Sequence, residues 1–209
     1  MLMQILGGKE DIREKLILSA ISLYAQKGID GVSLREIGVS SGAKNSGVMQ
    51  YHFGSKLGLL GAIMEKIVQH LSLLKAQNPP QEAEDIDSLV KQTVKNIATI
   101  VSVYDWGEDA VKVMSRMLME TSTDIRNIIN RYFSEHSVQL YQRISTFYPD
   151  VEPNKIKLRV LLALDCIIHG MSESKSLSNS PVGKISFYNK QELVDQLSDF
   201  IVGGITYKL

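Results

Sequence analysis

The sequence predicts an all-α protein with an N-terminal three-helix head and a larger C-terminal helical bundle. Apolar residues recur every three or four positions along most of the 209 residues, and the alternating pattern of strands is nearly absent. Capping residues, glycines and prolines interrupt this pattern at intervals suited to single helices. A hydrophobic content of 44% is ordinary for a chain that buries a core. We expect two domains, formed by residues 1–55 and residues 56–209.

The first helix is expected over residues 11–27, with Gly28 at its end. Its apolar stripe consists of Ile12, Leu16, Ala20, Leu23 and Tyr24. A stripe of this width predicts a helix that packs one side against a core.

Residues 33–56, SLREIGVSSGAKNSGVMQYHFGSK, predict two short helices joined by a tight turn. Ser33 and Glu36 form a capping box at the start of the first short helix, and Gly42 suits its exit. Asn45 is a good N-cap for the second, expected over residues 46–52, and Ser55 caps the helix that follows. This order is typical of a helix-turn-helix, which places one helix in a DNA major groove.

This stretch resembles the DNA-binding region of the TetR family of bacterial regulators. The resemblance covers about residues 11–65 and rests on Ile37, Gly42, the sequence Tyr51-His52-Phe53, and Gly54-Ser55-Lys56 followed by Leu59-Leu60. Counting back from Phe53, the turn is one residue longer than in the commonest family form. The register of individual base contacts therefore stays open.

Candidate DNA contacts follow from the polar residues around the second short helix. Glutamine can read adenine with two hydrogen bonds, and an apolar side chain can meet a thymine methyl group. Free amides at a helix start favour a phosphate. The candidates are Ser33, Lys44, Asn45, Ser46, Val48, Gln50, Tyr51, His52 and Lys56.

A fourth helix, expected over residues 55–76, carries a continuous apolar seam and connects the head to the body. Further helices are expected over residues 85–104, 108–121, 124–147 and 154–173, and a last one is capped by Asn189 and Glu192. The helix over 154–173 is apolar nearly all round, which predicts burial on all sides. We expect one side to meet the core and the other a second subunit, as the last two long helices do in the four-helix dimer bundle that the resemblance implies. The candidate interface residues are Leu161, Leu164, Ile168, Leu197, Phe200 and Ile201.

The body is also expected to hold a regulatory site, because a bundle core can house a small apolar ligand fixed by a few polar groups. Methionine suits a permissive pocket, and buried polar side chains need partners. The candidate effector-binding residues are Asn96, Tyr104, Trp106, Met114, Met117, Tyr132, Phe133 and His136. Asp165 and His169, one helical turn apart, are expected to pair with each other, join the dimer contact or touch the effector.

Composition argues against several other classes of protein. The net charge is zero, with a slight basic bias in residues 1–60, where seven Lys/Arg face five Asp/Glu. The four histidines and the single cysteine show no metal-ligand spacing, and no cofactor motif is present, so we expect no metal, no cofactor and no catalytic residues. Residues 38–42 match the hydrolase motif G-x-S-x-G, but they end a helix rather than follow a strand. No apolar run is long enough to cross a membrane, and the single cysteine fits a cytoplasmic location.

These features predict a homodimeric regulator of double-stranded DNA that binds a near-palindromic operator. The resemblance implies a repressor that an unknown small-molecule effector releases from DNA. Two other classes remain open: a DNA-binding regulator without an effector, and a helical enzyme or carrier that uses a cavity in the body. Activation, rather than repression, also remains open.

Overall fold

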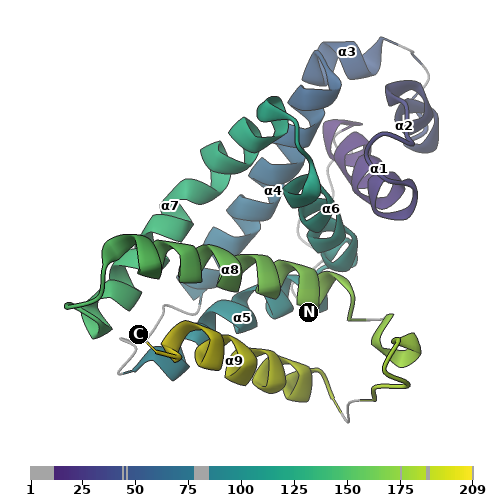
Figure 1. The fold of residues 1–209 in the computed structure, drawn as a ribbon. Coiled ribbons are helices and arrows are strands. Elements are labelled where there is room, and N and C mark those ends of the chain that lie inside the picture. The colour runs from purple at the N-terminus through teal and green to yellow at the C-terminus, as the bar shows by residue number, and fades with distance from the viewer. Residues whose placement is uncertain are drawn as a thin grey trace.

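A computed structural model of the chain describes residues 12–43, 45, 47–77, 85–174, 176–186 and 189–208. Within these ranges the secondary structure is helical, apart from one isolated bridge between Ser180 and Gly183 (Figure 1). The all-α prediction is therefore confirmed.

The head consists of α1 (Ile12–Lys27), α2 (Leu34–Ser40) and α3 (Val48–Phe53). The long helix α4 (Lys56–Gln77) leaves it and runs into the body. The body contains α5 (Ile86–Val103), α6 (Gly107–Met119), α7 (Thr123–Phe147), α8 (Pro153–Ser172) and α9 (Lys190–Thr206), with a short 3-10 turn over Ser176–Asn179. The predicted cap of α9 is present, because the Asn189 side chain accepts from the Glu192 amide. α8 is capped by the Glu152 side chain, which accepts from the amides of Asn154 and Lys155.

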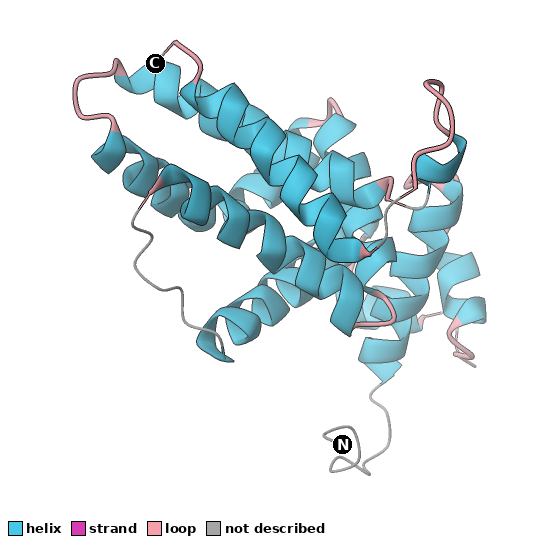
Figure 2. Ribbon diagram, turned by 90° about the horizontal axis from the view of Figure 1, so that it is seen from below, coloured by secondary structure: helices cyan, strands magenta, loops and turns pink. Residues whose placement is uncertain are grey.

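The head lies at one end of α4, and α9 lies at the opposite end of the molecule (Figure 1). α4 packs against α7 and α5, and α6 contacts both α1 and α8. On the far side of the body α8 and α9 lie side by side, and α9 also covers α5 (Figure 2).

α4 serves both parts of the molecule because its apolar seam is continuous. Leu59, Leu60 and Ile63 are fully buried near the head, and Leu71 and Leu74 are buried further along in the body. The helix has the length and mean hydropathy (1.3) of a membrane span, but half of that window is buried inside the protein. Its hydropathy is therefore that of a core helix that packs on both sides.

A polar contact joins the head directly to the body. The Arg116 guanidinium on α6 donates a hydrogen bond of 3.0 Å to the carbonyl of Ala25, near the end of α1. Gly28 follows with a φ of 84°, and a Cβ placed there would approach Arg116 Nη1 to 2.9 Å. Glycine at this position therefore allows both the left-handed turn that ends α1 and the close approach of Arg116.

Candidate nucleic-acid interface and ligand cavity

The turn between α2 and α3 is fixed by local hydrogen bonds. The Ser33 hydroxyl accepts from the Glu36 amide at 3.1 Å, so Ser33 caps α2 as predicted. Glu36 pairs with Lys27 of α1 at 2.5 Å. Gly42, with a φ of 76°, donates to the Val39 carbonyl, and Ala43 donates to the Gly38 carbonyl. These two bonds form the glycine-dependent motif that closes a helix C-terminus.

α3 begins later than predicted, at Val48 instead of residue 46. The reason is the Asn45 side chain, which accepts from the Gly47 amide at 2.9 Å and so makes a turn of its own before the helix. Gly54, with a φ of 69°, then ends α3, and Ser55 caps α4 by accepting from the Gly58 amide. α3 is thus a single short helix held between two turns.

α3 presents its polar side outward. The Tyr51 side chain is 86% exposed, and Asn45, Gln50 and Ser33 are also exposed. Met49, on the opposite side, is buried against the head core. Val48 and His52 are half-buried, and Val48 packs partly on the core, which limits its reach toward a thymine methyl group. The candidates Lys44 and Ser46 lie outside the described residues.

Lys56 is held by the head itself. Its ammonium pairs with Asp30 at 3.3 Å and lies 6.0 Å from the centre of the Tyr24 ring. The Asp30 carboxylate is largely exposed, so the pair costs little to open. Lys56 can therefore exchange Asp30 for a phosphate at the start of α4.

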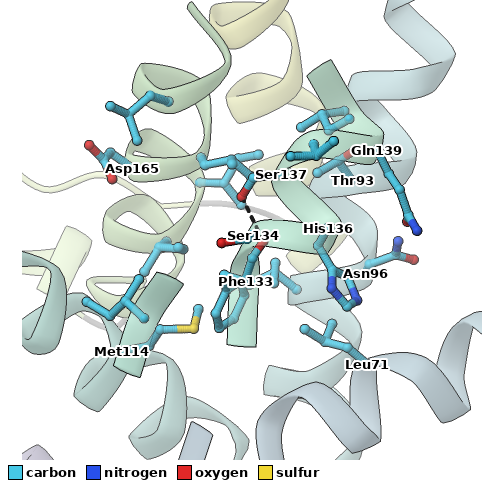
Figure 3. A pocket seen from close by; sticks show the side chains of 18 of the residues that line it. Leu71, Thr93, Asn96, Met114, Phe133, Ser134, His136, Ser137, Gln139 and Asp165 are labelled. Carbon is cyan, nitrogen blue, oxygen red and sulfur yellow. Dashed lines mark hydrogen bonds between the residues drawn. The ribbon is translucent and has the colours of Figure 1, made fainter. Parts of the chain in front are cut away.

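A cavity of about 470 Å³ lies in the body between α4, α5, α6, α7 and α8. This volume falls in the range of small-molecule sites. Most of the lining is aliphatic or aromatic, with Leu71, Met114 and Phe133 among the residues around it (Figure 3). Eleven of the described lining residues are polar or charged, and they come from α4, α5, α7 and α8, but most of the surface that the lining exposes is apolar. The arrangement suits a largely apolar ligand that needs only a few polar contacts.

Half of the predicted effector residues line this cavity, namely Asn96, Met114, Phe133 and His136. Tyr104, Trp106, Met117 and Tyr132 do not line it. The rings of Tyr104 and Trp106 stack with their centres 4.9 Å apart, and the His70 ring packs edge-on against both. Met117 is fully buried elsewhere in the core, and the Tyr132 hydroxyl is directed at Gly61 of α4.

His136 is the most unusual polar group in the cavity. Its Nδ1 atom is buried and has no hydrogen-bond partner within the described part of the chain. Burial lowers the pKa of this imidazole, and the nearby Lys75 ammonium lowers it further, although Glu135 opposes the shift. The neutral ring is therefore favoured, with a polar atom left for a ligand or a water molecule.

The two cationic residues of the cavity were not identified from the sequence. Lys75 of α4 and Arg143 of α7 line it. Burial lowers the pKa of Lys75, Glu135 opposes this, and Arg143 adds to it. Their spacing in the sequence could have predicted this position. Leu71 and Lys75 lie four residues apart, and His136 and Arg143 lie seven residues apart, so the two members of each pair share a helix face.

Asp165 and His169 have separate roles in this structure. His169 Nδ1 lies 2.6 Å from the hydroxyl of Ser115 on α6, and Asp165 lines the cavity. Burial raises the pKa of Asp165, and His169 opposes that shift. In Figure 3 Asp165 lies across the cavity from Asn96 and His136.

In the single chain α8 is buried on one side and exposed on the other, and whether a second subunit covers the exposed side stays a prediction. Ile156, Val160 and Ile167 are buried, whereas Leu158, Leu161 and Leu162 are each more than half exposed. On α9, Phe200 is 69% exposed. Leu164 and Leu197 are half-buried.

Two predicted interface residues need correction. Ile168 and Ile201 are 6% and 3% exposed inside the chain, so they have almost no surface to offer a partner. α8 is apolar nearly all round, so periodicity could not separate Ile168 from Leu161.

No group of three or more metal-ligating side chains occurs among the described residues. The G-x-S-x-G match lies at the end of α2 and in the turn after it, with no strand before it in the described head. The geometry that activates a nucleophile in that motif is therefore missing.

This architecture is also found in known proteins. Residues 101–204, about half of the chain, match the family model described as the tetracyclin repressor-like C-terminal domain. The chain is similar to the fatty acid degradation regulator FadR from Bacillus halodurans, with 16% identity, a TM-score of 0.70, and coverage of 96% of this chain and 100% of that one. No curated protein sequence matches significantly.

Two further solved structures share the fold. GusR from Salmonella enterica has 17% identity and a TM-score of 0.63, with coverage of 96% of this chain and 98% of that one. A regulatory protein in the TetR family from Rhodococcus RHA1 has 15% identity and a TM-score of 0.61, covering 93% and 97%. At such identities the likeness establishes the fold.

Proposed function

The chain belongs to the TetR family of transcriptional regulators, and we propose that it is a homodimeric repressor released from a near-palindromic operator by a small molecule. The observation that carries this proposal is the exposed polar face of α3, with Tyr51 and Gln50 directed outward. α3 leads into α4, whose other end lines a ligand-sized cavity. A helix held this way can enter a major groove while its neighbours contact phosphates.

In the DNA complex we assign base contacts to Gln50 and Tyr51 on α3. Ser33, Asn45, His52 and Lys56 surround them and suit the phosphate backbone, as do Lys44 and Ser46 by sequence. Val48 is a weaker candidate because it is half-buried. We assign DNA binding to residues 1–55, and ligand binding and dimerisation to residues 56–209. The boundary between them lies at the start of α4.

We propose the exposed apolar side of α8 and α9 as the dimer interface. Leu158, Leu161 and Leu162 share one side of α8, and Phe200 projects from α9, the helix beside it. Several large apolar side chains exposed close together mark an association surface. Two heads related by such an interface would occupy successive major grooves, roughly 34–36 Å apart or a multiple of this distance.

A ligand in the cavity would act through differential affinity for two arrangements of the heads. Met114 lines the cavity from α6, and two residues further on Arg116 binds the end of α1. α6 is thus a short physical link between ligand and head. We propose no enzymatic activity for the chain, and a location in the cytoplasm where its DNA target lies.

The test is selection of DNA from a randomised duplex library by the full-length protein, repeated with Gln50→Ala and Tyr51→Ala. Enrichment of a palindromic motif is expected. Gln50→Ala should relax preference at one position of each half-site, since a good base contact contributes about 1–3 kcal/mol.

The matched control is Gln69→Ala, which removes an exposed glutamine of α4 remote from α3. It should select the same motif as the unmodified protein. Retention of DNA without any motif, lost uniformly as salt rises, would contradict the proposed function.

A further inference from the structure

The cavity in the body has a chemical asymmetry that narrows the kind of ligand it takes. Two cationic side chains, Lys75 and Arg143, line it, and the Lys75 ammonium is close enough to act on both Arg143 and His136. Among the described lining residues Asp165 is the only acidic one, and it lies across the cavity from His136 and Asn96 (Figure 3). Most of the remaining wall is apolar.

The two cations are short of counter-charge. Neither Lys75 nor Arg143 forms an ion pair within the parts of the chain that the structure describes. The nearest carboxylate that acts on Lys75 is that of Glu135, an exposed residue whose Oε1 accepts from the Gln139 side chain at 3.2 Å. Lys75 and Arg143 therefore repel each other in a half-buried setting, which an added anion would relieve.

Neutral polar groups line the cavity as well. The Asn96 carbonyl oxygen accepts from Gln92 at 2.8 Å, which leaves the Asn96 amino group as a donor. His136 Nδ1 is buried without a partner in the described residues. Cationic and neutral donors that line the same cavity suit a carboxylate or sulfate group, because hydrogen bonds to an ionised acceptor are the stronger ones.

We propose that the cavity binds an amphipathic organic anion, with its charged group against Lys75, Arg143 and His136 and its apolar part against Leu71, Met114 and Phe133. The inference rests on the proposed function only in calling this ligand the effector. An apolar ligand without a charge would leave the two cations uncompensated, and a cationic ligand would add to their repulsion.

The test uses three probes that share one apolar chain, namely dodecanoate, dodecanol and dodecyltrimethylammonium. Their binding to the full-length protein is measured by calorimetry below their micelle-forming concentrations, without DNA. Dodecanoate should bind at least about tenfold more tightly than dodecanol, a difference of about 1.4 kcal/mol. Dodecyltrimethylammonium should bind most weakly.

Lys75→Met and Arg143→Met keep an apolar stem and remove one charge each. Either change should reduce the preference for dodecanoate over dodecanol to a few-fold, with dodecanol binding nearly unchanged. Lys95→Met is the control, because Lys95 is an exposed lysine of α5 that does not line the cavity. It should leave all three affinities as they are.

Equal binding of dodecanoate and dodecanol, tighter binding of the cation, or no saturable binding of dodecanoate would overturn the proposal. An anion preference that survives both substitutions would overturn it too, because the charge would then be held elsewhere. None of these outcomes touches the DNA selection experiment, so failure of the anion site and failure of the regulator are distinguishable.

Discussion

At the scale of single residues, Tyr24 links the head core to a measurable pH response. Its side chain is fully buried in α1, and its hydroxyl has no hydrogen-bond partner in the described chain. Burial, reinforced by the Asp30 carboxylate, raises the pKa of Tyr24 from 10.0 to about 12. The phenol therefore keeps its proton in the folded state at a pH where the unfolded chain has lost it.

We predict that this phenol makes the protein less stable as pH rises from 10 to 12. In that window the unfolded state binds fewer protons than the folded state, so the free energy of unfolding falls, by at most about 3 kcal/mol from this group. Tyr24→Phe should be nearly neutral at pH 7 and should flatten the decline in urea unfolding experiments. Tyr207→Phe, at an exposed tyrosine, should leave it unchanged. Equal slopes for Tyr24→Phe and the unmodified protein would contradict the assignment.

At the scale of elements, helical periodicity and caps predicted most of the fold. The caps at Ser33, Ser55 and Asn189 are present, because a side-chain oxygen near a helix start has local amides to bind. The start of α3 was misplaced because Asn45 makes a turn with Gly47 before the helix begins. Such competition between a turn and a cap depends on backbone geometry that the residue types do not specify.

The cavity was predictable only in part, for a different physical reason. Periodicity indicates which side of a helix faces inward, but not which neighbour it meets. Phe133 and His136 face the cavity, whereas Trp106 faces His70 and Lys66, whose ammonium lies 4.6 Å from the ring centre. The sequence did not predict that Lys75 and Arg143 line the cavity, because charged residues at helical spacing are usually exposed to solvent.

Arg116 is expected to stabilise the end of α1 from α6. Arg116→Ala removes the hydrogen bond to the Ala25 carbonyl and should speed hydrogen exchange at the last turn of α1 and at Gly28, with smaller effects on α4. The comparison is Arg126→Ala, at an exposed arginine of α7, which should leave exchange in α1 unaltered. Unchanged protection in Arg116→Ala would show that α1 and α6 are held by apolar packing alone.

At the scale of the whole molecule, the dimer decides whether one head or two contact DNA. Phe200→Asp places a charge on the exposed apolar side of α8 and α9 while leaving the core intact. We predict that sedimentation velocity will detect a monomer, and that operator affinity will fall by at least about tenfold because the second head is lost. Val182→Asp, at a residue 87% exposed in the loop before α9, should remain dimeric and bind normally. A dimeric Phe200→Asp would move the interface elsewhere.

The central claim is that two copies of α3 read one operator as a rigid pair. The most direct measurement compares affinity for the selected operator with affinity for versions lengthened between the half-sites by about half a helical turn and by about one full turn. We predict that the half-turn insertion abolishes tight binding, because the second half-site then faces away from its head. The full-turn insertion should restore part of it only if the heads can separate. Equal affinity for the original and the half-turn operator would contradict the paired-head account.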